Sequence, residues 1–281
     1  MSPSQSFTHE LDNGKSLHGI VDLPEQSGPR PTVVICHGFK GFLEWGFFPY
    51  LAQLLAERGL VAIRFNLTGS GMEPGEELVT RPLDFRNATF SQDLAELQSL
   101  LEAVSDHLLP DRIDPDRLGL FGHSRGGGTA LLAASRDPWK SRLRALVTWA
   151  GVSTFDRLNE AEKQYWRERG EVPVVNARTG QELMIDVNVL RDLETHGPEL
   201  DLVSAGGARE APWLTVHGDE DETVPVDEAR LLATEAAPPS ELVVIEGGNH
   251  TFGAQHPFAG PTPDLVQALN ATQRWFRKHL A

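Results

Sequence analysis

The sequence predicts an α/β protein with a mostly parallel, twisted β-sheet, helices on both faces of the sheet and an antiparallel hairpin at the N-terminus. Two observations support this prediction, and a third indicates an insertion. An Asn-Gly pair separates two strand-like runs near the start of the chain, and six later apolar runs alternate with helical patterns. One interval between two of these runs is too long for a single crossover helix.

The N-terminal hairpin is predicted from residues 6–11, SFTHEL, and residues 16–23, SLHGIVDL. Between them lies Asp12-Asn13-Gly14-Lys15. An Asn-Gly pair between two such runs is a strong signal for a tight antiparallel turn, because these residues adopt the required positive φ readily.

The predicted parallel strands are almost continuously apolar, as expected where helices cover both faces of a sheet. They are the runs TVVICHG, LVAIRFN, LGLFGHS, ALVTWAG, WLTVHGD and ELVVIEGG. The segments between them follow a helical period of 3.6 residues. Two predicted helix faces carry Leu94, Leu97, Leu101 and Leu108, and then Leu265, Leu269, Phe276 and Leu280.

About 60 residues separate VTWAG from WLTVHGD, which indicates an insertion. We therefore expect residues 1–151 and 211–281 to form the core and residues 152–210 to form an inserted cap or lid over a pocket. The alternative is a structural elaboration that only covers the edge of the sheet. An amphipathic pattern in the insertion places on one side Phe155, Leu158, Tyr165 and Trp166.

Composition restricts the partners and the compartment. At 281 residues and 40% hydrophobic, the chain can bury a large core. Its formal charge of -15 argues against nucleic acids and anionic membranes as partners. Cys36 is the single cysteine, the first residues lack a secretory signal, and no run is long enough to cross a bilayer. A cytoplasmic location is expected, and the sequence leaves open whether the chain forms a homodimer.

The stretch LGLFGHSRGGGTAL contains the candidate nucleophile. Gly122-His123-Ser124-Arg125-Gly126 matches G-x-S-x-G between a predicted strand and a predicted helix, where a sharp turn would expose the Ser124 hydroxyl. The glycines at 126–128 cost about 1 kcal/mol each in a helix relative to alanine, so close packing must justify them. The helix N-terminus would also favour negative charge beside the serine.

A serine nucleophile needs a histidine base and a carboxylate that orients it. In this type of fold they should follow the serine in the order acid, then histidine, each just after a later strand. The run DEDETVP after WLTVHG supplies four carboxylates, of which Asp219 and Asp221 are both in reach. After ELVVIEGG comes His250, which we prefer as the base, with His256 as the less well-placed alternative.

The oxyanion of a tetrahedral intermediate needs N–H donors. The stretch ICHGFKG ends a predicted strand at His37-Gly38, where the glycine would let the backbone turn so that the Phe39 amide faces the serine. The amide of Arg125, directly after the nucleophile, would be the second donor.

The segments HGFKG, GHSRGG, HGDEDETVP and GGNHTF, in this order, resemble the α/β-hydrolase superfamily. The similarity covers about residues 15–280 and is greatest to the dienelactone-hydrolase-like and prolyl-oligopeptidase-like branch, which includes small cinnamoyl and feruloyl esterases. The resemblance implies that Asp221 is the catalytic acid and His250 the base. Dienelactone hydrolases use a cysteine nucleophile, so Ser124 favours an ester over a dienelactone, and Cys36 is expected to be a small buried residue.

The resemblance implies a serine hydrolase that cleaves small-molecule carboxylic esters through an acyl-enzyme, without a metal or an organic cofactor. Aromatic residues near the predicted site favour a small or aromatic acyl group. The residues expected to bind substrate are His37, Gly38, His123, Phe155, Tyr165 and Trp166. A peptidase or amidase of the same branch, and a non-catalytic module that binds apolar ligands, are the alternatives.

Overall fold

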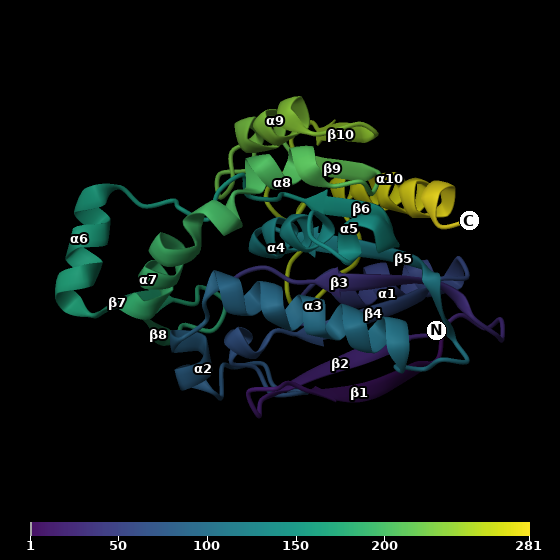
Figure 1. The fold of residues 1–281 in the computed structure, drawn as a ribbon, viewed down its shortest axis with the longest axis horizontal. Coiled ribbons are helices and arrows are strands. Elements are labelled where there is room, and N and C mark those ends of the chain that lie inside the picture. The colour runs from purple at the N-terminus through teal and green to yellow at the C-terminus, as the bar shows by residue number, and fades with distance from the viewer. Residues whose placement is uncertain (1) are drawn as a thin grey trace.

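The computed structural model describes residues 2–281 and contains an eight-stranded sheet in the order β1-β2-β4-β3-β5-β6-β9-β10 (Figure 1). The predicted hairpin and all six predicted parallel runs form strands of this sheet. Only β2 runs antiparallel to its neighbours β1 and β4. The strands are β1 Ser4–Glu10, β2 Ser16–Asp22, β3 Arg30–Cys36, β4 Val61–Asn66, β5 Ile113–His123, β6 Leu143–Trp149, β9 Trp213–Gly218 and β10 Ser240–Ile245.

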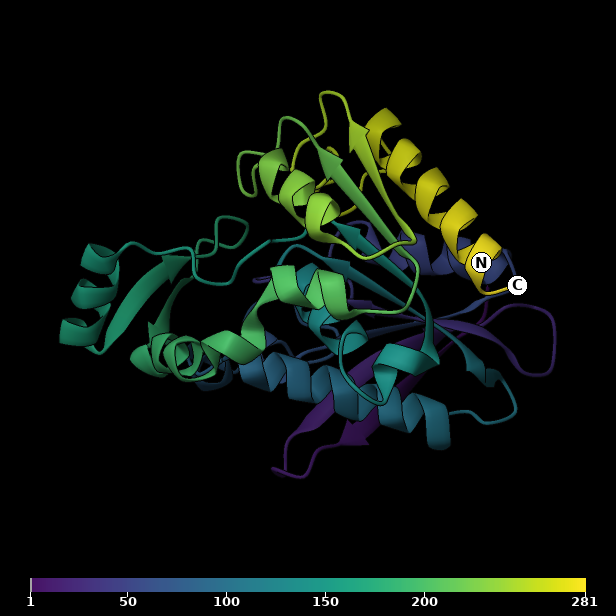
Figure 2. The same cartoon turned by 45° about the horizontal axis from the view of Figure 1, so that its top comes forward.

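Helices cover both faces of the sheet, as predicted (Figures 1 and 2). One face packs against α3 (Phe90–Asp106), α4 (Arg125–Ala134), α5 (Trp139–Arg142), α8 (Leu202–Ala208) and α9 (Val226–Glu235). The other face packs against α1 (Phe48–Glu57) and α10 (Pro263–His279). Within residues 2–281, none of the helices is both long enough and apolar enough to cross a membrane.

The double covering explains why the parallel strands read as continuous apolar runs. In β3, Val34 and Cys36 belong to the core under α3 and α4, whereas Val33 and Ile35 belong to the core under α1 and α10. Successive side chains of a strand point to opposite faces, so both sets must be apolar. Cys36 is fully buried, as expected for a small apolar residue.

The segment 152–210 holds α6 (Glu160–Arg169), the hairpin β7 (Glu171–Val175) and β8 (Glu182–Asp186), α7 (Val187–His196) and the short helix η2 (Gly197–Leu200). These elements project from one side of the body, far from the chain termini (Figures 1 and 2). The last helix of the segment, α8, packs instead against α4 and α9 in the layer over the sheet.

The glycines at the start of α4 allow very close packing, and this packing offsets the low helix propensity of glycine. A Cβ atom on Gly126 would lie 2.3 Å from the carbonyl oxygen of His37, at the end of β3. A Cβ atom on Gly128 would lie 2.9 Å from the ring of Phe155. The first turn of α4 therefore rests directly on its neighbours.

We predict that Gly126→Ala lowers the free energy of unfolding by about 3 kcal/mol, because the new methyl group meets rigid backbone. Gly197→Ala is the matched control, since a Cβ atom there meets nothing within 4 Å and the φ of -47° suits alanine. It should change stability by less than about 1 kcal/mol. Urea denaturation of both variants measures the difference, and equal losses would contradict the packing argument.

Candidate active site

Ser124 occupies a strained turn between β5 and α4. Its φ of 56° and ψ of -124° lie in a region that residues with a side chain rarely adopt. The Ser124 N–H donates to the carbonyl oxygen of Trp149 at 2.9 Å, which ties the turn to β6. A Cβ atom on Gly122 would lie 2.3 Å from the carbonyl oxygen of Gly126, so the glycines on either side allow the chain to turn this sharply.

The structure brings the hydroxyl of Ser124 and the imidazole of His250 into hydrogen-bond contact. His250 Nε2 lies 3.0 Å from Ser124 Oγ, although 126 residues separate them along the chain. His250 follows β10, and its backbone carbonyl accepts a hydrogen bond from His123 Nε2 at 3.0 Å. The side chain next to the nucleophile thus holds the loop that carries the candidate base.

Asp221 completes the chain of hydrogen bonds. Its Oδ2 accepts from His250 Nδ1 at 2.7 Å, and its Oδ1 accepts from the backbone N–H groups of Thr223 and Val224, both at 2.9 Å. Burial of Asp221 opposes its ionisation. The hydrogen bonds from His217, from His250 and from the backbone N–H of Val224 outweigh burial and hold the pKa of Asp221 below its ordinary value. A permanently charged carboxylate suits the stabilisation of an imidazolium.

The other candidates for acid and base are engaged elsewhere. Asp219 accepts the N–H of Gly247 at 2.7 Å, in the turn after β10. His256 accepts the N–H of Gly46 at its Nδ1, and its Nε2 lies 2.7 Å from the carboxylate of Glu77. Both ring nitrogens of His256 therefore contact groups other than the serine hydroxyl, whereas His250 and Asp221 form one hydrogen-bonded chain with it.

The two backbone N–H groups expected to hold an oxyanion, those of Phe39 and Arg125, have no hydrogen-bond partner in the described part of the chain. A Cβ atom on Gly38 would lie 3.0 Å from Cβ of Ser124 and 3.5 Å from the nitrogen of Arg125, so this glycine lets the loop after β3 approach the serine. The Arg125 side chain is fixed by an ion pair with buried Asp93, 2.7 Å away.

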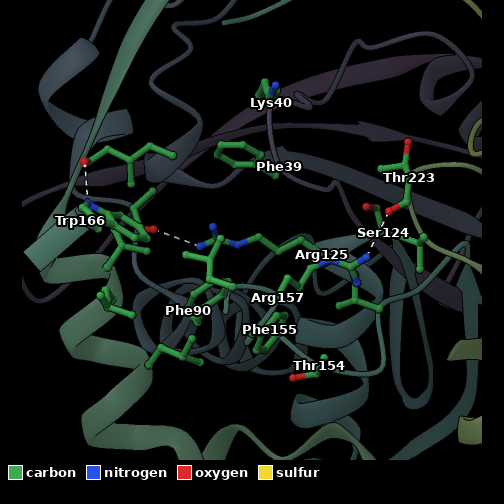
Figure 3. A pocket seen from close by; sticks show the side chains of 18 of the residues that line it. Phe39, Lys40, Phe90, Ser124, Arg125, Thr154, Phe155, Arg157, Trp166 and Thr223 are labelled. Carbon is green, nitrogen blue, oxygen red and sulfur yellow. Dashed lines mark hydrogen bonds between the residues drawn. The ribbon is translucent and has the colours of Figure 1, made fainter. Parts of the chain in front are cut away.

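A cavity of about 450 Å³ opens from Ser124 and His250 (Figure 3). Phe155 and Trp166 both line it and are nearly buried, with the Trp166 indole N–H donating to the carbonyl of Ile185 at 3.2 Å. Figure 3 places Ser124 and Trp166 at opposite sides of the cavity. Its lining is largely apolar and includes Phe39, Phe90, Phe155, Trp166, Val189 and Leu190.

A second cavity, of about 370 Å³, also reaches Ser124 and His250. Gly38 and His123 line it, as do polar residues from the loop between β7 and β8. Phe39 and Lys40 line both cavities, so the loop after β3 lies between the two spaces. The serine is thus accessible from an apolar side and from a more polar side.

Two residues expected to bind substrate lie outside the lining of these cavities. Tyr165 is 49% exposed, and its hydroxyl accepts from Arg169. Tyr165 and Trp166 are consecutive in α6, and neighbouring helical residues point about 100° apart, so they do not share a side as the amphipathic pattern suggested. His37 is buried, and its Nε2 accepts the N–H of Leu67 at 3.1 Å.

The sequence reasoning missed a second histidine on the candidate acid. His217 of β9 is fully buried, and its Nε2 lies 2.8 Å from the carbonyl oxygen of Val224 and 3.3 Å from Oδ2 of Asp221. The position of His217 four residues before Asp221, in the run WLTVHGD, is the feature of the sequence that could have indicated this contact. Within residues 2–281, no three or more His, Cys, Asp or Glu side chains gather as potential metal ligands.

Burial lowers the pKa of His37 to about 4, so this ring is neutral in the folded protein at pH 5. The unfolded chain binds a proton near the ordinary value of 6.5, so stability falls as the pH drops from 6.5 towards 4. We predict that His37 accounts for about 2 kcal/mol of the loss between pH 7 and pH 5.

Urea denaturation at the two pH values measures this loss. The variant His37→Gln keeps an acceptor for the Leu67 N–H but does not titrate, so its loss should be smaller than that of the wild type by this amount. Parallel losses in the two proteins would contradict the assignment.

Comparison with known proteins identifies the family. The model of the prolyl oligopeptidase family matches residues 45–281. An uncharacterized 31.7 kDa protein in the traX-finO intergenic region of Escherichia coli is 24% identical over 97% of this chain and 98% of its own length. Monoacylglycerol lipase of Mycolicibacterium smegmatis is 26% identical over 90% of each chain.

A solved structure shares the fold. Est1E from Butyrivibrio proteoclasticus, with ferulic acid bound, superposes with a TM-score of 0.76 at 20% identity, over 98% of this chain and 99% of that one. The proteins similar to this chain include esterases and other hydrolases. The chain belongs to the prolyl oligopeptidase family and has the α/β-hydrolase fold.

Proposed function

We propose that this protein is a serine carboxylesterase that cleaves esters with a small or aromatic acyl group. The observation that carries the proposal is that hydrogen bonds join Ser124 to His250 and His250 to Asp221, and that Ser124 and His250 line an apolar cavity. A serine hydroxyl becomes an effective nucleophile when an oriented imidazole can take its proton.

The reaction would proceed in two halves. His250 Nε2 takes the proton as Ser124 Oγ attacks the ester carbonyl, and Asp221 stabilises the resulting imidazolium. The N–H groups of Phe39 and Arg125 hold the oxyanion. His250 then returns the proton to the leaving alcohol, and it activates a water molecule that releases the acid from the acyl-enzyme.

The first cavity supports an apolar acyl group. Aromatic and aliphatic side chains make up most of its lining, and its volume of about 450 Å³ suits a small organic group. Est1E binds ferulic acid and the mycobacterial relative is a lipase, and both similarities favour esters. The family is named for peptidases, so amide hydrolysis is the second candidate activity.

We predict that a fluorophosphonate probe labels the protein at Ser124 alone and that Ser124→Ala is not labelled. Peptide mapping by mass spectrometry identifies the modified residue. 4-Nitrophenyl esters should be hydrolysed, and aminoacyl 4-nitroanilides should not. Label retained by the alanine variant, or activity on the anilides alone, would contradict the proposal.

His250→Gln and Asp221→Asn should each lower kcat by about a thousandfold or more, because triad residues act as a unit. His256→Gln is the matched control. Its imidazole contacts Glu77 and the Gly46 N–H outside the reacting chain, so kcat should stay within about twofold of the wild type. Circular dichroism verifies that the variants are folded. Inactivation by His256→Gln alone would show that the base is wrongly assigned.

A further inference from the structure

Cationic side chains line the two cavities at Ser124, although the whole protein is acidic. The chain has a formal charge of -15. Among residues 2–281, however, no aspartate or glutamate lines either cavity. Four cationic side chains line them: Lys40, Arg125, Arg157 and Arg178. The walls of the two cavities thus contain cationic side chains and no carboxylate of the described residues.

Each of the three arginines forms an ion pair with a carboxylate that does not line either cavity. Arg125 pairs with Asp93 at 2.7 Å. Arg157 pairs with Glu228 at 2.7 Å. Arg178 pairs with Glu77 at 2.9 Å and also donates to the backbone carbonyl of that residue. These pairs fix the arginines as parts of the walls.

Lys40 differs from the arginines. In the described part of the chain its ammonium group contacts no carboxylate, and its hydrogen bond goes to the carbonyl oxygen of Val175, 3.0 Å away at the end of β7. Lys40 follows Phe39 and lines both cavities. Burial lowers the pKa of its amine, which means that the charged form has lost some of its hydration and lacks a compensating anion.

Asn176 supplies a second unpartnered donor in the polar cavity. It is 6% exposed and follows Val175 directly. Its Oδ1 accepts the N–H of Arg178 at 3.2 Å, whereas its Nδ2 donates to no group within the described residues. This amide N–H is not among the fully buried unpaired groups of residues 2–281, so it is open to the cavity and can donate to a ligand oxygen there.

We propose that Lys40 and Asn176 form a subsite for an anionic group, and that the enzyme prefers esters that carry a carboxylate on the half bound in the polar cavity. This inference rests on the proposed esterase function. The apolar half of the substrate occupies the cavity lined by Phe155 and Trp166, and the ester lies at Ser124 between the two spaces. The preferred substrate class is therefore an amphiphilic ester with one apolar end and one anionic end.

Two pairs of esters test the preference, one for each half of the substrate. In the first, 4-nitrophenyl hydrogen adipate is compared with the 4-nitrophenyl ester of adipic acid monoamide. In the second, 3-carboxyphenyl hexanoate is compared with 3-carbamoylphenyl hexanoate. Each pair replaces a carboxylate with a neutral carboxamide of nearly the same shape. The ratio of kcat/KM within a pair measures the preference for charge. Because the proposed function places an apolar acyl group in the first cavity, the second pair should show the preference, and a preference in the first pair alone would contradict that placement.

In the wild type, the second pair should favour the carboxylate by about tenfold, the size expected for a charge-assisted hydrogen bond. Lys40→Gln removes the charge but keeps a donor for the Val175 carbonyl, so it should bring this ratio close to one by slowing hydrolysis of the carboxylate ester. Lys40→Arg should retain the preference. Lys140→Gln, an equal change of net charge at a surface ion pair with Glu210, should leave the ratio unchanged.

The outcomes separate this inference from the function on which it rests. Hydrolysis of the carboxamide esters without any preference for carboxylate, or a preference that survives Lys40→Gln, would overturn the anion subsite and leave the esterase intact. Failure of the wild type to hydrolyse any of the four esters would overturn the esterase proposal itself, and the subsite with it. Loss of the carboxamide rate in Lys40→Gln would show that Lys40 acts by holding the β7–β8 hairpin, which also contradicts the subsite.

Discussion

The close contact between the start of α4 and the end of β3 is the constraint on which the candidate site depends. Gly126 touches the backbone at His37, and Gly38 touches Ser124, so two segments nearly 90 residues apart meet without side chains between them. This contact accompanies the φ of 56° at Ser124 and brings Gly38, the residue before Phe39, next to the Arg125 amide. Because the two backbone segments are packed this closely, the N–H groups of Phe39 and Arg125 have little freedom to reorient.

The carboxylate end of the hydrogen-bonded chain is held just as firmly. Asp221 receives two backbone N–H groups on one oxygen, and the other oxygen lies within reach of His217 and His250. Burial alone would favour the neutral acid, and the hydrogen bonds reverse that tendency. Burial also lowers the pKa of His123 to about 3, so this ring, tilted against His250 with its centroid 4.9 Å away, stays neutral and does not compete for the carboxylate.

Local patterns in the sequence predicted the sheet and the position of the reacting groups. Continuous apolar runs such as TVVICHG reflect covering on both faces, and the glycines around Ser124 reflect contacts that exclude a side chain. The cavities were less predictable because they depend on tertiary packing. Trp166 lines a cavity and the adjacent Tyr165 does not, and nothing in a single sequence shows that Asn176 of a remote hairpin lines the same cavity as Lys40.

The core and the inserted segment contribute different properties to the site. Ser124, Asp221 and His250 all follow strands of the main sheet, whose helices bury it on both faces. Trp166 and Asn176, by contrast, come from elements that project from the body and meet the core through contacts such as the hydrogen bond between Lys40 and Val175. Changes in the projecting elements can therefore reshape what the cavities accept without displacing the reacting groups. In the proposed enzyme, the insertion and the core loop that carries Lys40 shape the cavities together, whereas the candidate reacting groups all follow strands of the sheet.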